Sequence, residues 1–204
     1  MSSKEIVNNR ERLLVLAACL LITFCMGTVH AFSTLIQNIE MQTNVGRMAS
    51  SLVYSTALIN VTLAVYVGHI LYRKFSPQVL IFFIAILPII GLLISNSESW
   101  IGWIIGYGIF FGFSSGLGYG LSLYIVSSVT ENEKLGFALG LVTASYAFGA
   151  VIFSMLYPFL FDHLGFKDGY ICGLLILSSI VFIGLVLFST SRMKIIKESS
   201  TSQQ

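Results

Sequence analysis

Polar side chains inside apolar stretches are the residues of this 204-residue chain with the chemistry to hold a solute. A histidine titrates near neutral pH, and tyrosine, serine and asparagine side chains both donate and accept hydrogen bonds. At ~1.5 Å per helical residue, most of these side chains lie near mid-depth of their stretches, while His30 lies ~9 Å to one side and Tyr119 lies toward the other. The candidates for a solute path are His30, Asn60, Ser114, Ser115, Tyr119 and Tyr146.

Two of these candidates also have a purely structural interpretation. His30 could couple transport to protons or contact an anion, or it could be a neutral histidine hydrogen-bonded to a neighbouring helix. Asn60 could contact the solute, or it could make an interhelical hydrogen bond worth ~0.6 kcal/mol. Both interpretations stay open at the level of the sequence.

Other chemistries have little support in the sequence. Cys19, Cys25 and Cys172 have neither metal-ligand spacing nor a CxxC pair, so we expect buried, unreactive thiols and no metal site. HExxH, GxSxG and P-loop motifs are absent, and we expect neither an enzyme nor a cofactor. Glu131 and Glu133 lie between apolar stretches, where a solvated charge cluster is expected.

Six apolar stretches must position the polar candidates. Most approach or exceed the ~20 residues that a helix needs to cross a ~30 Å hydrocarbon layer. The chain is 56% hydrophobic and 10% charged, whereas soluble domains are ~25% charged. We therefore predict an all-α membrane protein with six transmembrane helices, spanning Leu13–Ile36, Met48–Leu71, Val79–Ile94, Trp100–Val126, Leu135–Phe159 and Tyr170–Phe188.

These spans divide the chain into an N-terminal segment (residues 1–12), a membrane domain (13–188) and a polar tail (189–204). The first apolar run exceeds the ~7–15 residues of a signal-peptide core, so it is predicted to remain as a span. The predicted loops hold about eleven, seven, five, eight and ten residues in chain order. None is long enough to fold as a separate domain.

The basic residues predict how the chain is oriented. With a cytoplasmic amino terminus, the outside loops hold only Arg47 and Lys167, and this bias predicts cytoplasmic termini in a plasma (inner) membrane. The basic residues are scattered over short loops, which argues against a nucleic-acid partner. The nine on the inside are Lys4, Arg10, Arg12, Arg73, Lys74, Lys134, Arg192, Lys194 and Lys197.

Polar and small residues gather in spans 1, 2, 4 and 5, while spans 3 and 6 are nearly uniformly apolar. Polar side chains within a bilayer face other helices or a water-filled cavity, so four helices should line a cavity and two should support them. The order polar, polar, apolar occurs twice, which indicates two three-helix repeats. A stripe of small residues allows close helix packing or sliding between two states; its glycines are Gly108, Gly112, Gly116, Gly120, Gly136, Gly140 and Gly149.

The loop after span 2 carries a family pattern. It reads Gly68-His-Ile-Leu-Tyr-Arg73-Lys74-Phe-Ser-Pro-Gln-Val-Leu80 and resembles the characteristic motif of the major facilitator superfamily, with Gly68, Arg73 and Lys74 in place. The motif's aspartate is replaced by Tyr72 or Arg73, so the charge contact that it makes in the family is not expected here. The resemblance implies one half of a major facilitator fold, with spans 1, 2, 4 and 5 around the cavity.

Spans 1, 4 and 5 are similar to the oxalate/formate antiporter and monocarboxylate transporter group. The similar segments are Gly27-Thr-Val-His-Ala-Phe-Ser33, Gly112-Phe-Ser-Ser-Gly-Leu-Gly-Tyr-Gly120 and Leu135-Gly-Phe-Ala-Leu-Gly-Leu-Val-Thr-Ala-Ser-Tyr-Ala-Phe-Gly149. The resemblance implies secondary transport of a small organic solute by alternating access, with a monocarboxylate as the narrower candidate. In that group the basic residues that hold the substrate lie chiefly in a second half, and no Lys or Arg lies inside the spans of this chain.

The implied partners are a bilayer, a small solute and a second six-span half. That half could be another copy of this chain, a separate chain, or the remainder of a longer product. The alternative is a non-transporting truncated half or a membrane interaction subunit.

Overall fold

The structure is a computed structural model that describes residues 9–190. Residues 1–8 of the predicted N-terminal segment and 191–204 of the predicted tail lie outside the described residues. Within residues 9–190, six helices are long and apolar enough to cross a membrane, and no strand occurs. This confirms the prediction of an all-α fold with six spans.

Two of the six spans contain segments of different helix type. Span 1 consists of α1 (Asn9–Met26) followed by the 3₁₀ segment η1 (Gly27–Thr34). Span 4 consists of α5 (Trp100–Trp103), the π-helical segment η2 (Ile104–Phe111) and α6 (Gly112–Val129). The remaining elements are the short helix α2 (Ile36–Thr43) and the spans α3 (Arg47–Lys74), α4 (Pro77–Ser95), α7 (Asn132–Leu164) and α8 (Phe166–Thr190).

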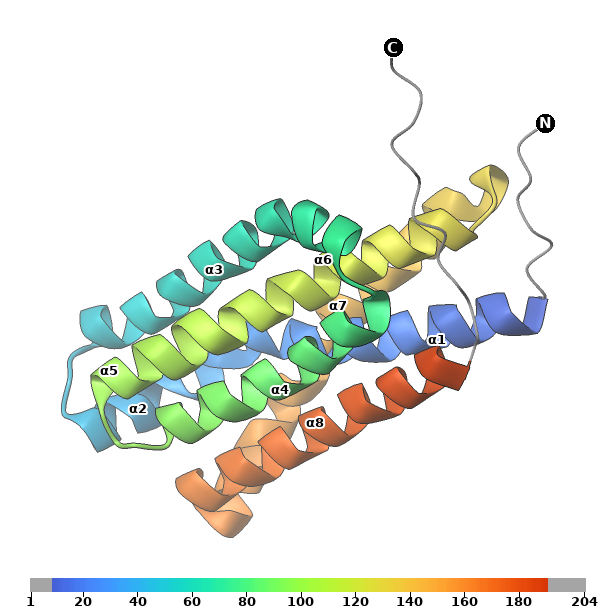
Figure 1. Cartoon of the computed structure of the whole chain (residues 1–204). Helices are drawn as coiled ribbons and strands as arrows, with labels where there is room; N and C mark the ends of the chain where they lie inside the picture. The colour runs from blue at the N-terminus through green and yellow to red at the C-terminus, as the bar shows by residue number, and fades with distance from the viewer. Residues whose placement is uncertain (1–8, 191–204) are drawn as a thin grey trace.

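Spans 1 and 4 form the centre of the bundle, and the long helices run roughly alongside one another (Figure 1). On one side, α3 packs against α6 and η2, and α7 packs against α1 and η1. On the other side, α4 packs against span 4, α8 packs against α1, and α4 and α8 contact each other. Span 2 packs on span 4 as span 5 packs on span 1, and span 3 packs on span 4 as span 6 packs on span 1. This correspondence is the arrangement expected of two three-helix repeats.

Polar contacts define the two ends of the bundle. At one end, the Arg12 guanidinium lies 2.5 Å from the Glu131 carboxylate, which joins the start of α1 to the start of α7. At the other end, Lys167 pairs with Glu98 and joins the α7–α8 turn to the α4–α5 turn. This second end also holds α2, so we call it the α2 end.

The spans are longer and the connections shorter than predicted. A two-residue break, Thr130–Glu131, separates α6 from α7, and a two-residue break, Phe75–Ser76, separates α3 from α4. Gly165 alone separates α7 from α8, with a φ of +79° that glycine adopts without strain. The predicted loops of eight, seven and ten residues are therefore wrong, because polar residues at the helix ends continue the helices. The predicted eleven-residue loop after span 1 is also wrong, since α2 occupies most of it.

Candidate functional site

Four of the six predicted path residues meet on one face of the bundle. His30 Nδ1 lies 2.8 Å from the Tyr54 hydroxyl, and the His30 ring meets the Tyr146 ring edge-on at a centroid distance of 5.3 Å. The Tyr146 hydroxyl lies 3.2 Å from Ser115 Oγ. We call Tyr54, His30, Tyr146, Ser115 and Tyr119 the polar cluster; it draws on spans 1, 2, 4 and 5.

Tyr119 extends the polar cluster toward the end opposite α2. Its ring lies 4.8 Å from the Tyr146 ring, and its hydroxyl lies 3.2 Å from the Thr143 hydroxyl. At the base of the cluster, Ser115 Oγ donates to the Met26 carbonyl at 2.7 Å. The cluster thus combines aromatic faces with hydroxyl groups and one imidazole, and it holds no fixed charge.

Close backbone contact between α1 and α7 positions His30 beside Tyr146. A Cβ at Gly27 would overlap the Tyr146 carbonyl oxygen, and a Cβ at Gly149 would overlap the Phe24 carbonyl oxygen. Ser145 Oγ also donates to the Leu20 carbonyl at 2.8 Å. Small residues therefore let the two backbones meet just ahead of His30 along span 1.

Exposure within the polar cluster is graded. His30 is exposed, Tyr54, Tyr119 and Tyr146 are half-buried, and Ser115 is fully buried. The titratable groups that face His30 are the Tyr54 hydroxyl from α3 and the Tyr146 ring from α7. The cluster is therefore accessible at His30 and anchored to the interior at Ser115.

Among the described residues, Ser114 and Asn60 make no hydrogen bond or ring contact with this cluster. Ser114 is fully buried and donates to the Ile84 carbonyl at 2.9 Å, so it faces α4. The Asn60 amide donates to the Thr56 carbonyl of its own helix at 2.9 Å. In both residues one donor bonds a backbone carbonyl, and their place on a solute path stays a prediction.

Tyr54 is a member that the sequence analysis missed. Residues of a helix are about 100° apart around its axis, so Tyr54 and Asn60 lie about 60° to opposite sides of Ala57. Ala57 is buried against the α6 backbone at Gly112. The two residues therefore face opposite edges of the α3–α6 contact, and only Tyr54 faces His30. The stripe of small residues around Ala57 is the signal that could have distinguished them.

The family-like motif at the end of α3 contacts α6 through a tyrosine. The Tyr72 hydroxyl donates to the Leu117 carbonyl at 3.2 Å, and the Tyr72 ring lies 5.5 Å from the Tyr124 ring. Gly68 is buried beneath the Tyr72 hydroxyl, whereas Arg73 and Lys74 are exposed in the last turn of the helix. Cations are favoured at that position by the helix dipole.

The predicted glycine stripe divides into two groups. A Cβ at Gly108, Gly112 or Gly116 would meet the α3 backbone or Thr56, and a Cβ at Gly120 would meet the Tyr72 hydroxyl. Gly136 and Gly140, near the start of α7, have nothing within 4 Å of an added Cβ. The first group and Gly149 thus pack helices within this chain, and Gly136 and Gly140 face outward.

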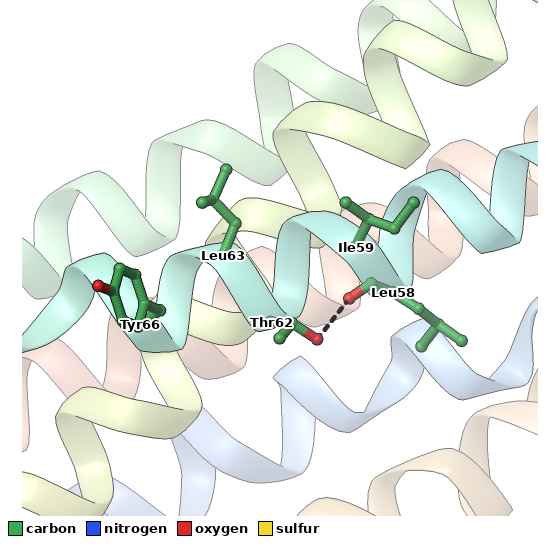
Figure 2. A pocket seen from close by; sticks show the side chains of 5 residues that line it. All are labelled: Leu58, Ile59, Thr62, Leu63 and Tyr66. Atoms are coloured by element: carbon green, nitrogen blue, oxygen red, sulfur yellow. Dashed lines mark hydrogen bonds between the residues drawn. The ribbon is translucent and has the colours of Figure 1, made fainter.

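A groove of about 540 Å³ on α3 lies apart from the polar cluster. Figure 2 shows its lining residues Leu58, Ile59, Thr62, Leu63 and Tyr66, all on α3. The Thr62 hydroxyl already donates to the Leu58 carbonyl at 3.0 Å. The groove therefore offers mainly apolar contact.

Cys19 and Cys25 are buried and Cys172 is half-buried, and all three are unpaired thiols. No group of three or more His, Cys, Asp or Glu side chains in this part of the chain could hold a metal ion.

The fold is shared with a solved transporter. The chain matches the crystal structure of the POT family transporter PepTSo with a TM-score of 0.66 at 15% sequence identity. The match covers 90% of this chain and 37% of the transporter, so this chain spans little more than a third of that protein. The chain is a multi-pass membrane protein whose six spans have the fold of one half of a major facilitator type structure.

Comparisons of sequence add no family. No protein-family model matches the chain. No curated protein matches it either. The likeness therefore rests on the arrangement of the six spans.

Proposed function

We propose that this chain moves a small organic solute across a membrane by alternating access with a second six-span half. A monocarboxylate is the narrower candidate, on the resemblance of spans 1, 4 and 5 to carboxylate transporters. The observation that carries the proposal is the polar cluster, because it joins side chains from four spans on one partly exposed face. Polar side chains within a bilayer need protein or a water-filled cavity beside them.

The exposure of the flanking helices supports a second half on this face. In an apolar stretch of 18 residues within each span, buried residues make up 17% for α7 and 22% for α3, against 56% for span 1 and 67% for span 4. Large apolar side chains point outward from both flanking helices, including Ile59 and Tyr66 on α3 and Phe137 and Met155 on α7. A second half covering α3 and α7 would enclose the polar cluster between two bundles.

The charges at the two ends support cytoplasmic termini. In the described chain, Arg10, Arg12, Arg73, Lys74 and Lys134 lie at the end opposite α2, and Arg47 and Lys167 lie at the α2 end. Under the positive-inside rule, the end opposite α2 faces the cytoplasm. The α2 end then faces outward, and His30 lies on the outer side of the polar cluster.

Within this proposal, His30 responds to protons. Its Nδ1 can accept the Tyr54 proton when the imidazole is neutral and must donate when the imidazole is charged. Protonation therefore changes the contact between span 1 and α3. Because the cluster holds no fixed charge, a carboxylate would need its cationic partner from the second half.

Uptake into liposomes containing the chain, alone and with a candidate second half, tests the proposal with lactate, formate and oxalate as probes. We expect solute-dependent flux that varies with pH, and His30→Ala should abolish the pH dependence while the protein stays folded. His69→Ala is the matched control, because His69 lies near the end of α3 and, among residues 9–190, bonds only its own helix. Unchanged pH dependence in His30→Ala would remove His30 from the mechanism.

The alternative function predicts a different result in the same preparation. A non-transporting half or an interaction subunit would show no flux with any probe, yet it would associate stably with an unrelated membrane protein. Its exposed α3 and α7 faces would serve as the contact surface. That outcome would overturn transport while leaving the six-span fold intact.

A further inference from the structure

The two central spans both depart from α-helical geometry at the same level of the bundle. Segment η1 is a 3₁₀ helix of eight residues in span 1, and η2 is a π-helix of eight residues in span 4. Runs of 3₁₀ helix longer than 3–4 residues are uncommon, and mid-helix 3₁₀ and π segments mark hinges and functional sites. Both segments lie in the half of the bundle nearer the α2 end.

A buried hydrogen bond joins the two segments. The Tyr107 hydroxyl of η2 donates to the Val29 carbonyl of η1 at 2.9 Å, and the Tyr107 side chain is fully buried. The Tyr107 ring also lies 5.0 Å from the Phe32 ring of η1. A rearrangement of either segment must therefore break these contacts or move the other segment with it.

Segment η1 also bears on the polar cluster directly. His30 is its fourth residue, and Phe32 stacks on Tyr54 at a centroid distance of 5.5 Å. A 3₁₀ helix turns about 20° more per residue than an α-helix. Conversion of η1 to an α-helix would therefore turn His30 by about 80° relative to Met26, which breaks the His30–Tyr54 contact.

The Thr28 hydroxyl is a buried hydrogen-bonding group of η1 that is left unsatisfied when η1 is a 3₁₀ helix. Thr28 Oγ1 is buried and has no hydrogen-bond partner among the described residues. In contrast, Thr23 Oγ1 in the preceding α-helical turn donates to the Cys19 carbonyl at 2.9 Å. An α-helical η1 would offer Thr28 the same bond to a carbonyl four residues earlier.

We propose that η1 and η2 are one coupled hinge, held together by the Tyr107–Val29 hydrogen bond, whose winding sets the position of His30. In one state η1 is a 3₁₀ helix and His30 bonds Tyr54. In the other state η1 is α-helical, Thr28 is satisfied, and His30 is released. This hinge does not depend on which solute the chain carries, or on whether it carries one.

Hydrogen–deuterium exchange of the chain in lipid nanodiscs tests the coupling. Tyr107→Phe removes the hydroxyl and keeps the ring, and we expect amide exchange to rise about tenfold in both 27–34 and 104–111. Tyr170→Phe is the matched control, because Tyr170 is as buried as Tyr107, lies in α8, and makes no hydrogen bond to η1 or η2 among the described residues. An increase confined to 104–111, or an equal increase in Tyr170→Phe, would overturn the proposal.

The unmodified chain provides a second test that does not depend on how the variants fold. A coupled hinge requires similar protection in 27–34 and 104–111, and lower protection there than in the adjoining α-helical segments 10–26 and 112–129. Protection that differs more than tenfold between the two hinge segments would show that they open independently. Similar protection of the two segments supports the coupled hinge and different protection contradicts it, whether or not transport is observed.

Discussion

Gly112 is the position where one methyl group tests the packing of α3 on α6. A Cβ added there would lie 2.7 Å from the Ala57 carbonyl oxygen and 2.8 Å from Ala57 Cα, whereas ordinary contact begins at 3.4 Å. The three nearest atoms that it would meet all belong to the α3 backbone. They cannot rotate away, so the two helices must separate by several tenths of an ångström.

Two opposing terms set the size of the effect. Alanine is favoured over glycine in a helix by ~1 kcal/mol, and forcing an extra methyl group into a packed interior costs ~1–3 kcal/mol. Because the overlap at Gly112 is with backbone, we take the upper part of that range and expect Gly112→Ala to destabilise the fold by ~1–2 kcal/mol. Gly140→Ala, with nothing within 4 Å, should be neutral or stabilising by up to ~1 kcal/mol.

Thermal unfolding of both variants in the same detergent measures the difference. A thiol-reactive dye reports unfolding through Cys19 and Cys25, both of which are buried in the folded chain. We expect a lower midpoint for Gly112→Ala than for the unmodified protein, and an unchanged or higher midpoint for Gly140→Ala. Equal midpoints for the two variants would refute the close α3–α6 backbone contact.

Two further predictions concern contacts near the ends of α3. Tyr72→Phe should destabilise the fold by ~0.5–1.5 kcal/mol in thermal unfolding, because the Leu117 carbonyl loses its hydroxyl donor; the exposed Tyr66→Phe should have no effect, and equal effects would contradict this role. A hydrogen bond from Arg47 lowers the pKa of Glu40, so this contact stabilises the fold above the unfolded-state pKa of the carboxyl and is lost as pH falls through the folded-state value. Glu40→Gln should therefore flatten the acid limb of a plot of stability against pH, and an unaltered limb would count against the pairing.

The spans could be predicted from the sequence because most of the apolar runs approach or exceed the ~20 residues that cross a membrane by themselves. The predicted Trp100–Val126 differs from the observed span by three residues, and Val79–Ile94 extends only to Pro77–Ser95. The loop lengths were predicted poorly because hydropathy falls before a helix ends. Residues such as Asp162 and His163 are polar yet helical, since a helix satisfies its own backbone up to the turn at Gly165.

Depth along a span follows from residue number, so the sequence by itself determined the six-span class and the level of His30, Ser115 and Tyr146. The direction in which each side chain points depends on how its helix is rotated about its axis. Backbone contacts between segments distant in sequence set that rotation, as at Gly112 with Ala57 and at Gly149 with Phe24. Only the tertiary structure could therefore decide that Tyr54 joins the cluster while Asn60 and Ser114 do not, because rotation follows from long-range packing.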